Sequence, residues 1–320
     1  MKLGVFVARV FKDLPFEEML DFVKSWGVEA VEFGTGNYPG DIFVKPAQLL
    51  ADGGKQKGFL HAVESRGMFI SAFSVHGNPL HPNRTIAREH HQTLIRTIDL
   101  AQQMGVPVVN CFSGNPGAPD STLYPNFAYL YWPPEYPEIL QWQWEQQVIP
   151  YWREVGRYAA QRGVNIGIEM HEGFTVHSPA DVLRLREAVG EVIGAGFDAS
   201  HLWTQGINPV EAVKILGFAG AIYHVSTKDM IFSEANMNLY GVLDPKPMDQ
   251  PGFRSWYYRT IGYGHDLKTW ADISSALRMV GYDYVLNIEQ EDPLIDGLEG
   301  FTKAAGNLRG LIIRSPLAEK

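Results

Sequence analysis

The sequence predicts a (β/α)8 barrel, an α/β fold in which eight parallel strands alternate with helices. Short apolar segments alternate eight times with longer segments whose apolar residues recur at helical spacing. The short segments are almost continuously apolar, as expected for parallel strands covered on both faces. Polar residues cluster at the ends of these strands, where such barrels place their active sites. An open, doubly wound sheet is the alternative, but the first strand, GVFVARVF, lacks the GxGxxG turn of that fold.

The first four strands are separated by segments rich in glycine and proline. We expect strands at residues 2–8, 28–34, 68–77 and 106–114, and helices at 15–26, 58–67, 86–105 and 145–163. The first helical segment, PFEEMLDFVKSW, has apolar residues at helical spacing and stops before Gly27, a common helix end. The segment at 86–105 is a longer amphipathic helix that also ends at a glycine.

The last four strands follow the same pattern. We expect strands at residues 164–170, 192–200, 221–229 and 282–290, and helices at 179–189, 209–216, 267–281 and 298–313. Two of these helices begin at a proline, Pro179 and Pro209, a residue that favours the first helical turn.

Two long insertions follow the fourth and seventh strands, at about residues 115–140 and 230–264. Aromatic residues are frequent in and just after the first: Tyr124, Phe127, Tyr129, Tyr131, Trp132, Tyr136, Trp142, Trp144, Tyr151 and Trp152. Pro133 and Pro134 predict a loop in part of it. We expect one domain over residues 1–320, with both insertions over the C-terminal face. The aromatic residues suit either stacking on sugars or a hydrophobic lid or dimer contact.

Composition excludes several classes of protein. The 320 residues are 45% hydrophobic, enough for one large core, and the net charge is −9. An acidic chain without a basic run is a poor candidate for nucleic acid or membrane binding. The single cysteine excludes an intrachain disulfide, and Arg9 and Lys12 interrupt the apolar N-terminal segment, which argues against a signal peptide. No apolar run approaches the ~18 residues of a membrane span. We expect a cytoplasmic protein without nucleic acid or membrane partners.

The candidate site is built from strand ends. Glu169 and His171 end the fifth strand two residues apart, so they point to the same side. Burying a carboxylate and an imidazole is costly unless a metal ion or substrate compensates. Other strands end in Glu32, His76, Asp198, His201, His224, Lys228, Asp229, Glu289 and Glu291.

Carboxylates and imidazoles from separate strands suit Mn²⁺, Mg²⁺, Co²⁺ or Zn²⁺, and no nearby cysteine offers a thiolate site. Each carboxylate alone is explained equally well as a salt-bridge partner or a helix cap. Glu169, Asp198 and Glu289 together, at the ends of three buried strands, predict a metal site.

The ordered set of Glu169, Asp198 and His201 in D-x-x-H, Lys228–Asp229 and Glu289 resembles the xylose isomerase-like TIM barrels over nearly the whole chain. This sugar phosphate isomerase/epimerase superfamily includes ketose 3-epimerases, inosose dehydratases and endonuclease IV. The resemblance implies a divalent metal, Mn²⁺ first, held by Glu169, Asp198, a histidine of the seventh strand and Glu289. It also implies that His201 contacts a substrate oxygen or a second metal.

The seventh strand departs from the family pattern His-x-Lys-Asp, because Ser226 stands where the histidine is expected. His224 lies two residues earlier, on the same side of the strand. Either His224 replaces the missing ligand or the metal has three protein ligands and more water. We assign the role to His224, so the predicted ligands are Glu169, Asp198, His224 and Glu289.

The resemblance implies proton abstraction next to a carbonyl, with a metal-stabilised enediolate. Glu169 and Glu289 are the implied proton-transfer pair. His171 is a third catalytic candidate, and a packed histidine is its alternative role. The predicted substrate-binding residues are His76, His201, Lys228 and Arg259.

The insertions resemble a subgroup, the large subunit of bacterial C-glycoside deglycosidases and related 3-keto-glycoside enzymes. The similar segments are HGNPLHP (76–82), WPPE (132–135), QWQWE (141–145), EMHEGF (169–174) and RTIGYGHD (259–266). This implies loss of an aglycone next to a 3-keto group and a small partner subunit.

The sequence thus predicts a metal-dependent sugar isomerase or epimerase, and we expect a homo-oligomer. A lyase or dehydratase acting on a 3-keto-glycoside or inosose is the alternative. An AP endonuclease is disfavoured by the charge of −9. A non-catalytic sugar-binding barrel is conceivable because of Ser226.

Overall fold

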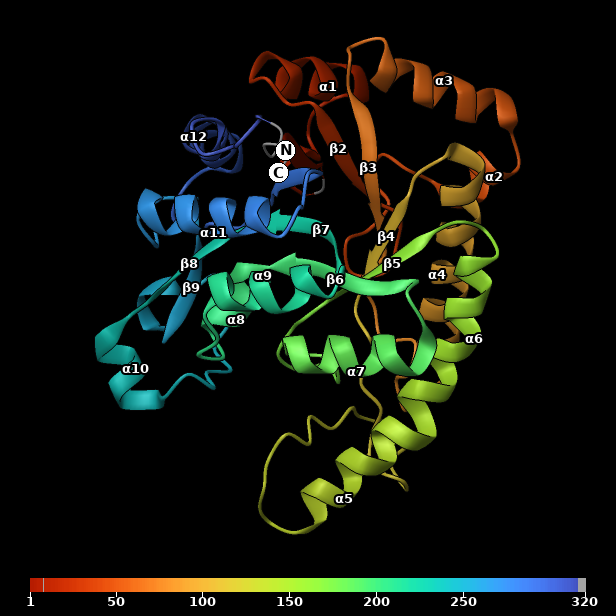
Figure 1. Cartoon of the computed structure of the whole chain (residues 1–320), viewed down its shortest axis with the longest axis vertical. Coiled ribbons are helices and arrows are strands. Elements are labelled where there is room, and N and C mark those ends of the chain that lie inside the picture. Colours follow the sequence, from red (N-terminus) through yellow and green to blue (C-terminus); the bar gives the residue numbers. More distant parts are fainter. Residues whose placement is uncertain (8, 316–320) are drawn as a thin grey trace.

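The computed structural model describes residues 1–7 and 9–315. Its parallel strands close into a barrel in the order β1-β10-β7-β6-β5-β4-β3-β2 (Figure 1). The barrel strands are β1 (Lys2–Val7), β2 (Ala30–Gly34), β3 (Phe69–Ser74), β4 (Val108–Cys111), β5 (Asn165–Glu169), β6 (Ile193–Asp198), β7 (Ile222–Thr227) and β10 (Val285–Ile288). The predicted (β/α)8 barrel is confirmed. Residue 8, the predicted end of the first strand, and residues 316–320 lie outside the described part.

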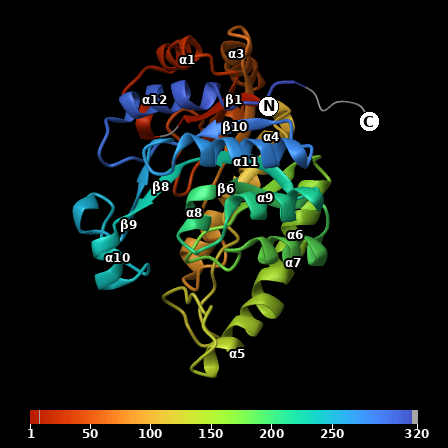
Figure 2. The same cartoon turned by 60° about the vertical axis from the view of Figure 1, so that its left-hand side comes forward.

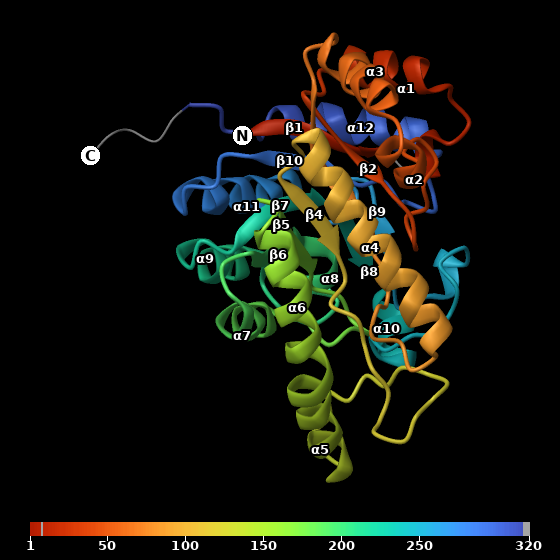
Figure 3. The same ribbon diagram turned by 90° about the vertical axis from the view of Figure 1, so that its right-hand side faces the viewer.

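Helices surround the barrel, as the turned views show (Figures 2 and 3). The longer ones are α1 (Phe16–Ser25), α3 (Gly53–Glu64), α4 (Arg84–Met104), α6 (Ile149–Ala160), α7 (Pro179–Val189), α9 (Pro209–Phe218), α11 (Leu267–Met279) and α12 (Gly297–Arg309). Shorter turns are η1 (Arg9–Phe11), α2 (Pro46–Leu50) and α8 (Ala199–Trp203). In the described part of the chain, no helix has both the length and the apolar character needed to cross a bilayer.

The first insertion differs from the prediction in where its helix begins. The helix starts at α5 (Glu135–Trp142), continues through a π-helical turn, η2 (Gln143–Val148), and runs into α6. The sequence predicted a helix only from residue 145. Pro137 lies in the first turn, where its missing N–H is not needed, and the wider π turn precedes Pro150. Helix α5 and the preceding loop project beyond the barrel in all three views (Figures 1, 2 and 3).

The second insertion contains secondary structure that the sequence did not predict. Strands β8 (Asp229–Phe232) and β9 (Trp256–Arg259) form an antiparallel pair outside the barrel. Between them lie α10 (Glu234–Tyr240) and the short turn η3 (Pro251–Phe253). The side chain of Asp229 is fully buried and accepts hydrogen bonds from the backbone N–H groups of Gly262 and Gly264, at 3.0 and 3.2 Å. This carboxylate therefore ties the segment after β9 to the start of β8.

A buried polar layer crosses the inside of the barrel below the site. Glu32, on β2, accepts hydrogen bonds from Asn110 Nδ2 at 2.7 Å and Asn287 Nδ2 at 2.6 Å. A Cβ at Gly167 would lie 2.3 Å from the oxygen of Asn110, and one at Gly4 would lie 2.6 Å from that of Asn287. Glycine on β5 and β1 thus makes room for the amides that hold Glu32.

Candidate active site

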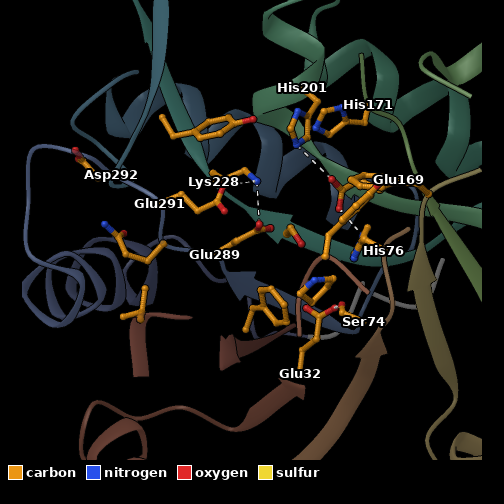
Figure 4. Close-up of a pocket in the computed structure, with 18 residues that line it drawn as sticks. Glu32, Ser74, His76, Glu169, His171, His201, Lys228, Glu289, Glu291 and Asp292 are labelled. Carbon is orange, nitrogen blue, oxygen red and sulfur yellow. Dashed lines mark hydrogen bonds and ion pairs between the residues drawn. The ribbon is translucent and has the colours of Figure 1, made fainter. Parts of the chain in front are cut away.

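A cavity of about 530 Å³ opens at the carboxyl ends of the barrel strands. Its acidic and basic lining residues are Glu32, His76, Glu169, His171, His201, Lys228, Glu289, Glu291 and Asp292 (Figure 4). Its apolar wall includes Phe6, Val10, Pro39 and Phe112. The volume lies within the range of small-molecule sites. The structure therefore brings most of the predicted site residues to one place.

Glu169 ends β5 and lies between two histidines (Figure 4). His76 Nε2 lies 3.0 Å from Oε2, and His201 Nε2 lies 3.2 Å from Oε1. Burial alone would raise the pKa of Glu169, but the two histidines hold this pKa well below its usual range. In turn, Glu169 raises the pKa of His76 despite its burial. Glu169 is therefore an ionised carboxylate facing the cavity.

His201 connects Glu169 with two further carboxylates. Its Nε2 lies 3.5 Å from Asp198 Oδ2, and its Nδ1 lies 3.3 Å from Glu172 Oε2. Burial would lower the pKa of His201, but Glu172 and Asp198 raise it well above its usual range. Burial alone would raise the pKa of Glu172, but the positive charge of His201 outweighs it and lowers this pKa to about 2. Both ring nitrogens of His201 therefore face carboxylate oxygens.

Lys228 lies beside Glu289 and Glu291, across the site from Glu169 (Figure 4). Its Nζ lies 2.9 Å from Glu289, 3.2 Å from Glu291 and 3.2 Å from Asp198. Burial opposes the charge of Lys228, yet these carboxylates raise its pKa well above its usual range. Burial, together with the negative charges of Glu291 and Glu169, raises the pKa of Glu289 to about 8 in spite of Lys228. Glu169 and Glu289 thus differ widely in proton affinity.

His171 lies beside His201, with ring centroids 4.0 Å apart. Burial, with the positive charge of His201, lowers the pKa of His171 to about 4. The imidazole is therefore neutral near pH 7, and its Nδ1 lies close to the backbone oxygen of Glu172. Its predicted catalytic role stays a prediction.

The donor atoms of Glu169, Asp198 and His201 lie within 4.8 Å of one another. Asp198 Oδ1 accepts a hydrogen bond from the backbone N–H of Ser200 at 2.8 Å. Its fully buried Oδ2 lies 3.2 Å from Lys228 Nζ and 3.5 Å from His201 Nε2, but it accepts no well-oriented hydrogen bond from any described residue. A buried carboxylate oxygen without such a donor, next to a second carboxylate and an imidazole, fits a divalent cation.

The family described as Xylose isomerase-like TIM barrel matches residues 20–311. The chain belongs to this family. A relative, the uncharacterized protein YfiH of Bacillus subtilis (strain 168), is 35% identical over 295 residues, which are 91% of this chain and 93% of YfiH.

Two solved structures share the barrel. The IOLI protein with a bound zinc atom has a TM-score of 0.65 and 16% identity, with 98% of both chains covered. A D-tagatose 3-epimerase-like protein has a TM-score of 0.65 and 18% identity, covering 97% of this chain and 98% of its own.

The structure does not bring His224 to the metal-binding group, although the sequence analysis assigned it the ligand role expected at Ser226. Its Nε2 lies 3.2 Å from Ser71 Oγ, and its Nδ1 lies 3.9 Å from Glu32. Two residues along a strand correspond to about 6.5 Å, so His224 lies one layer deeper than Ser226, which lines the cavity. His201 takes the corresponding place beside Glu169 and Asp198.

Two other predicted residues have partners that the sequence did not reveal. Glu289 was predicted as a metal ligand, but Lys228 lies between it and Asp198. Arg259 was predicted to bind substrate, but its Nε donates to Asp292 Oδ2 at 3.0 Å, and Arg259 is not part of the cavity lining.

Two residues of the site were missed by the sequence analysis: Glu172 and Tyr258. Glu291, named with Glu289 at the end of the last strand, lines the cavity. Glu172 lies in the turn after β5, where strand periodicity no longer tells which way a side chain points. Tyr258 lies on the unpredicted strand β9.

Proposed function

We propose that this chain is a divalent-metal-dependent sugar isomerase or epimerase that removes a proton next to a carbonyl group. The observation that supports this most directly is the pair of Glu169 and Glu289 on one cavity. Glu169 has a pKa well below its usual range, and Glu289 has a pKa of about 8. Two carboxyl groups whose pKa values are driven apart are suited to act as base and acid.

Glu169, Asp198 and His201 would hold the metal ion, and we propose Mn²⁺, with Mg²⁺, Co²⁺ and Zn²⁺ as alternatives. When bound, such an ion acts as a Lewis acid that stabilises negative charge on a substrate oxygen. The zinc atom in the IOLI structure supports a metal site in this barrel fold.

The protein's own residues move the proton. In one direction the carboxylate of Glu169 accepts the proton from the carbon next to the carbonyl, and protonated Glu289 delivers one to that carbon. Microscopic reversibility exchanges the two roles in the other direction. The Lys228 ammonium lies 2.9 Å from Glu289. It stabilises the carboxylate that forms when Glu289 gives up its proton. His76 fixes the second oxygen of Glu169 at 3.0 Å.

Proton exchange in D₂O tests this function. We expect the protein with Mn²⁺ to exchange the proton next to the carbonyl of D-tagatose or D-fructose, observed by NMR. E169Q and E289Q should each lower the exchange rate by roughly 100-fold or more. E187Q, at an exposed position on α7, is the charge-matched control and should keep wild-type exchange. If the wild-type protein exchanges no proton of any ketose or keto-glycoside with any of the four metals, the proposal is wrong.

A lyase or dehydratase acting on a 3-keto-glycoside or inosose is the second candidate. The specific observation in its favour is the apolar wall formed by Phe6, Val10, Pro39 and Phe112 in a cavity of about 530 Å³. Such a wall suits an aglycone better than a free hexose. Both candidates begin with the same proton abstraction, so release of a phenol or alcohol during exchange with a 3-keto-glycoside would identify the lyase. That alternative includes the small partner subunit implied by the resemblance to C-glycoside deglycosidases.

A further inference from the structure

Tyr258 is the residue of β9 that reaches the cavity. It lines the cavity, and its ring lies over Lys228, with Nζ 4.6 Å from the ring centroid. The ring also meets His201 edge to face, with centroids 5.8 Å apart. Tyr258 therefore lies between Lys228, which contacts Glu289, and His201, which contacts Glu169.

The hydroxyl group of Tyr258 makes no hydrogen bond within residues 1–7 and 9–315, although only 9% of the residue is exposed. Other tyrosines around the barrel are paired: Tyr158 donates to Asp99 at 2.6 Å, Tyr282 to the backbone oxygen of Val285 at 2.8 Å, and Tyr284 to that of Ser71 at 2.9 Å. A buried tyrosine hydroxyl normally has a partner. Tyr258 lines the cavity, so water or a ligand in the cavity is the partner open to its hydroxyl group.

The second insertion holds this ring firmly. Tyr258 pairs with Met230 in the β8–β9 ladder and packs with it and Trp256 in a small separate hydrophobic cluster. Asp229, next to Met230, also accepts a hydrogen bond from Trp270 Nε1 at 3.1 Å. A Cβ at Gly264 would lie 2.2 Å from the backbone oxygen of Met230, so the turn after β9 lies directly on β8. The ring is thus positioned before any ligand arrives.

The charged residues around Tyr258 favour an uncharged ligand group over an anionic one. Glu289, Glu291 and Asp292 follow the last barrel strand, in the region where many barrels of this fold bind phosphate. The cations beside these residues, Lys228 and Arg259, are already engaged by Glu289, Glu291 and Asp292. An anionic group therefore gains no free cation from them, whereas a neutral hydroxyl group can accept from a phenol and donate to a carboxylate.

We infer that Tyr258 is a substrate-contact residue whose phenol donates a hydrogen bond to an uncharged hydroxyl group of the sugar. The inference deepens the proposed function and rests on it. The insertion after the seventh barrel strand thereby supplies a specificity-determining side chain.

The test compares Y258F with Y257F. Phenylalanine keeps the ring and removes only the hydroxyl group, so packing is preserved. Tyr257 is the next residue on β9, and it does not line the cavity. The probes are D-tagatose and D-fructose with Mn²⁺, with KM from exchange in D₂O and dissociation constants from ligand-observed NMR. We expect Y258F to raise both by roughly 3- to 10-fold, with kcat and melting temperature near wild type, because one neutral hydrogen bond is lost. Y257F should match wild type.

The outcomes separate this inference from the proposed function. If the wild-type protein exchanges protons and Y258F has the same KM and dissociation constant as Y257F, the inference is overturned and the function stands. If the wild-type protein binds a probe without exchange and Y258F binds it more weakly, the function fails and the contact by Tyr258 is supported. A lower melting temperature in Y258F with unchanged binding would show a structural role and overturn the inference. Absence of any binding to the wild-type protein would overturn both.

Discussion

Glu172 acts on the site through His201 and does not line the cavity. Its carboxylate lies 3.3 Å from His201 Nδ1 and 3.5 Å from Thr204 Oγ1. Because the pKa of Glu172 is lowered to about 2, the group is an acceptor near neutral pH, so His201 Nδ1 carries the proton and donates. The other nitrogen, Nε2, is the one that faces Glu169 and Asp198. Carboxylates in this position orient metal-binding histidines.

We therefore expect E172Q to weaken the binding of Mn²⁺ by roughly 10- to 100-fold, the usual effect of losing such a partner. Glutamine keeps the size of the side chain but offers His201 a neutral acceptor. The dissociation constant can be measured by titration followed by electron paramagnetic resonance, without any substrate. E187Q on α7 makes the same change of charge away from the site. Equal affinity in E172Q and E187Q would show that Glu172 does not position His201.

Residues on regular strands were the ones that the sequence could place. Glu169, Asp198 and Glu289 follow from buried strands of known direction, because side chains at a strand end face the mouth of a barrel. The prediction for His224 failed for a related reason: sharing a side of the strand with Ser226 does not mean sharing a layer. The position of Lys228 between Asp198 and Glu289 depends on three strands at once, which no local pattern records.

At the scale of elements, α7 links the first insertion to the barrel. Ser178 and Asp181 form a capping box at its start, in which each side chain contacts the backbone N–H of the other residue. Asp181 Oδ2 also lies 2.6 Å from His177 Nδ1. Its Oδ1 accepts from the hydroxyl group of Tyr129, in the first insertion, at 3.2 Å. One carboxylate thus caps a helix and anchors the insertion.

Removing this carboxylate with D181N should lower the free energy of unfolding by about 1–2 kcal/mol near pH 6. Burial would raise the pKa of Asp181, but His177 and Ser178 outweigh it and lower the pKa. A carboxyl group with a lowered folded-state pKa stabilises the protein above its unfolded pKa of about 3.9, and this stabilisation is lost as the pH falls through the folded value. Urea unfolding of both proteins from pH 6 to pH 3 should show the difference constant above about pH 5 and shrinking below about pH 4. A difference that does not change with pH would contradict the assignment.

The elements that the sequence could not place have particular causes. Strand β9 (Trp256–Arg259) is four residues long and follows a stretch rich in proline and glycine, so it gives no alternating pattern long enough to recognise. The helix that begins at Glu135 contains Pro137 and Pro150, and proline usually marks a helix boundary. The barrel strands were predictable because each is buried on both faces and lies between helices with clear apolar periodicity.

At the scale of the whole molecule, several acidic side chains lie close together at the carboxyl ends of the barrel strands. Glu169, Glu172, Asp198, Glu289 and Glu291 come from β5, β6 and β10 or the turns after them. Their basic partners are Lys228, which contacts three of them, and the histidines His76 and His201, which contact Glu169. Buried carboxylates in excess of their partners oppose folding, because their mutual repulsion is poorly screened away from water. The barrel therefore holds an arrangement that a bound cation would stabilise.

We expect Mn²⁺ to raise the melting temperature of the protein. An ion that binds only the folded chain adds about 2.7 kcal/mol to stability when its free concentration is 100 times its dissociation constant. D198N removes the carboxylate whose Oδ2 has no well-oriented donor in the described residues, so it should abolish most of this increase. E187Q should show the full increase, and EDTA should reverse it in the wild-type protein. Differential scanning calorimetry with and without Mn²⁺ measures all four. Because the free energy comes from binding at Asp198, an equal increase in D198N would place the ion elsewhere and contradict the proposed metal site.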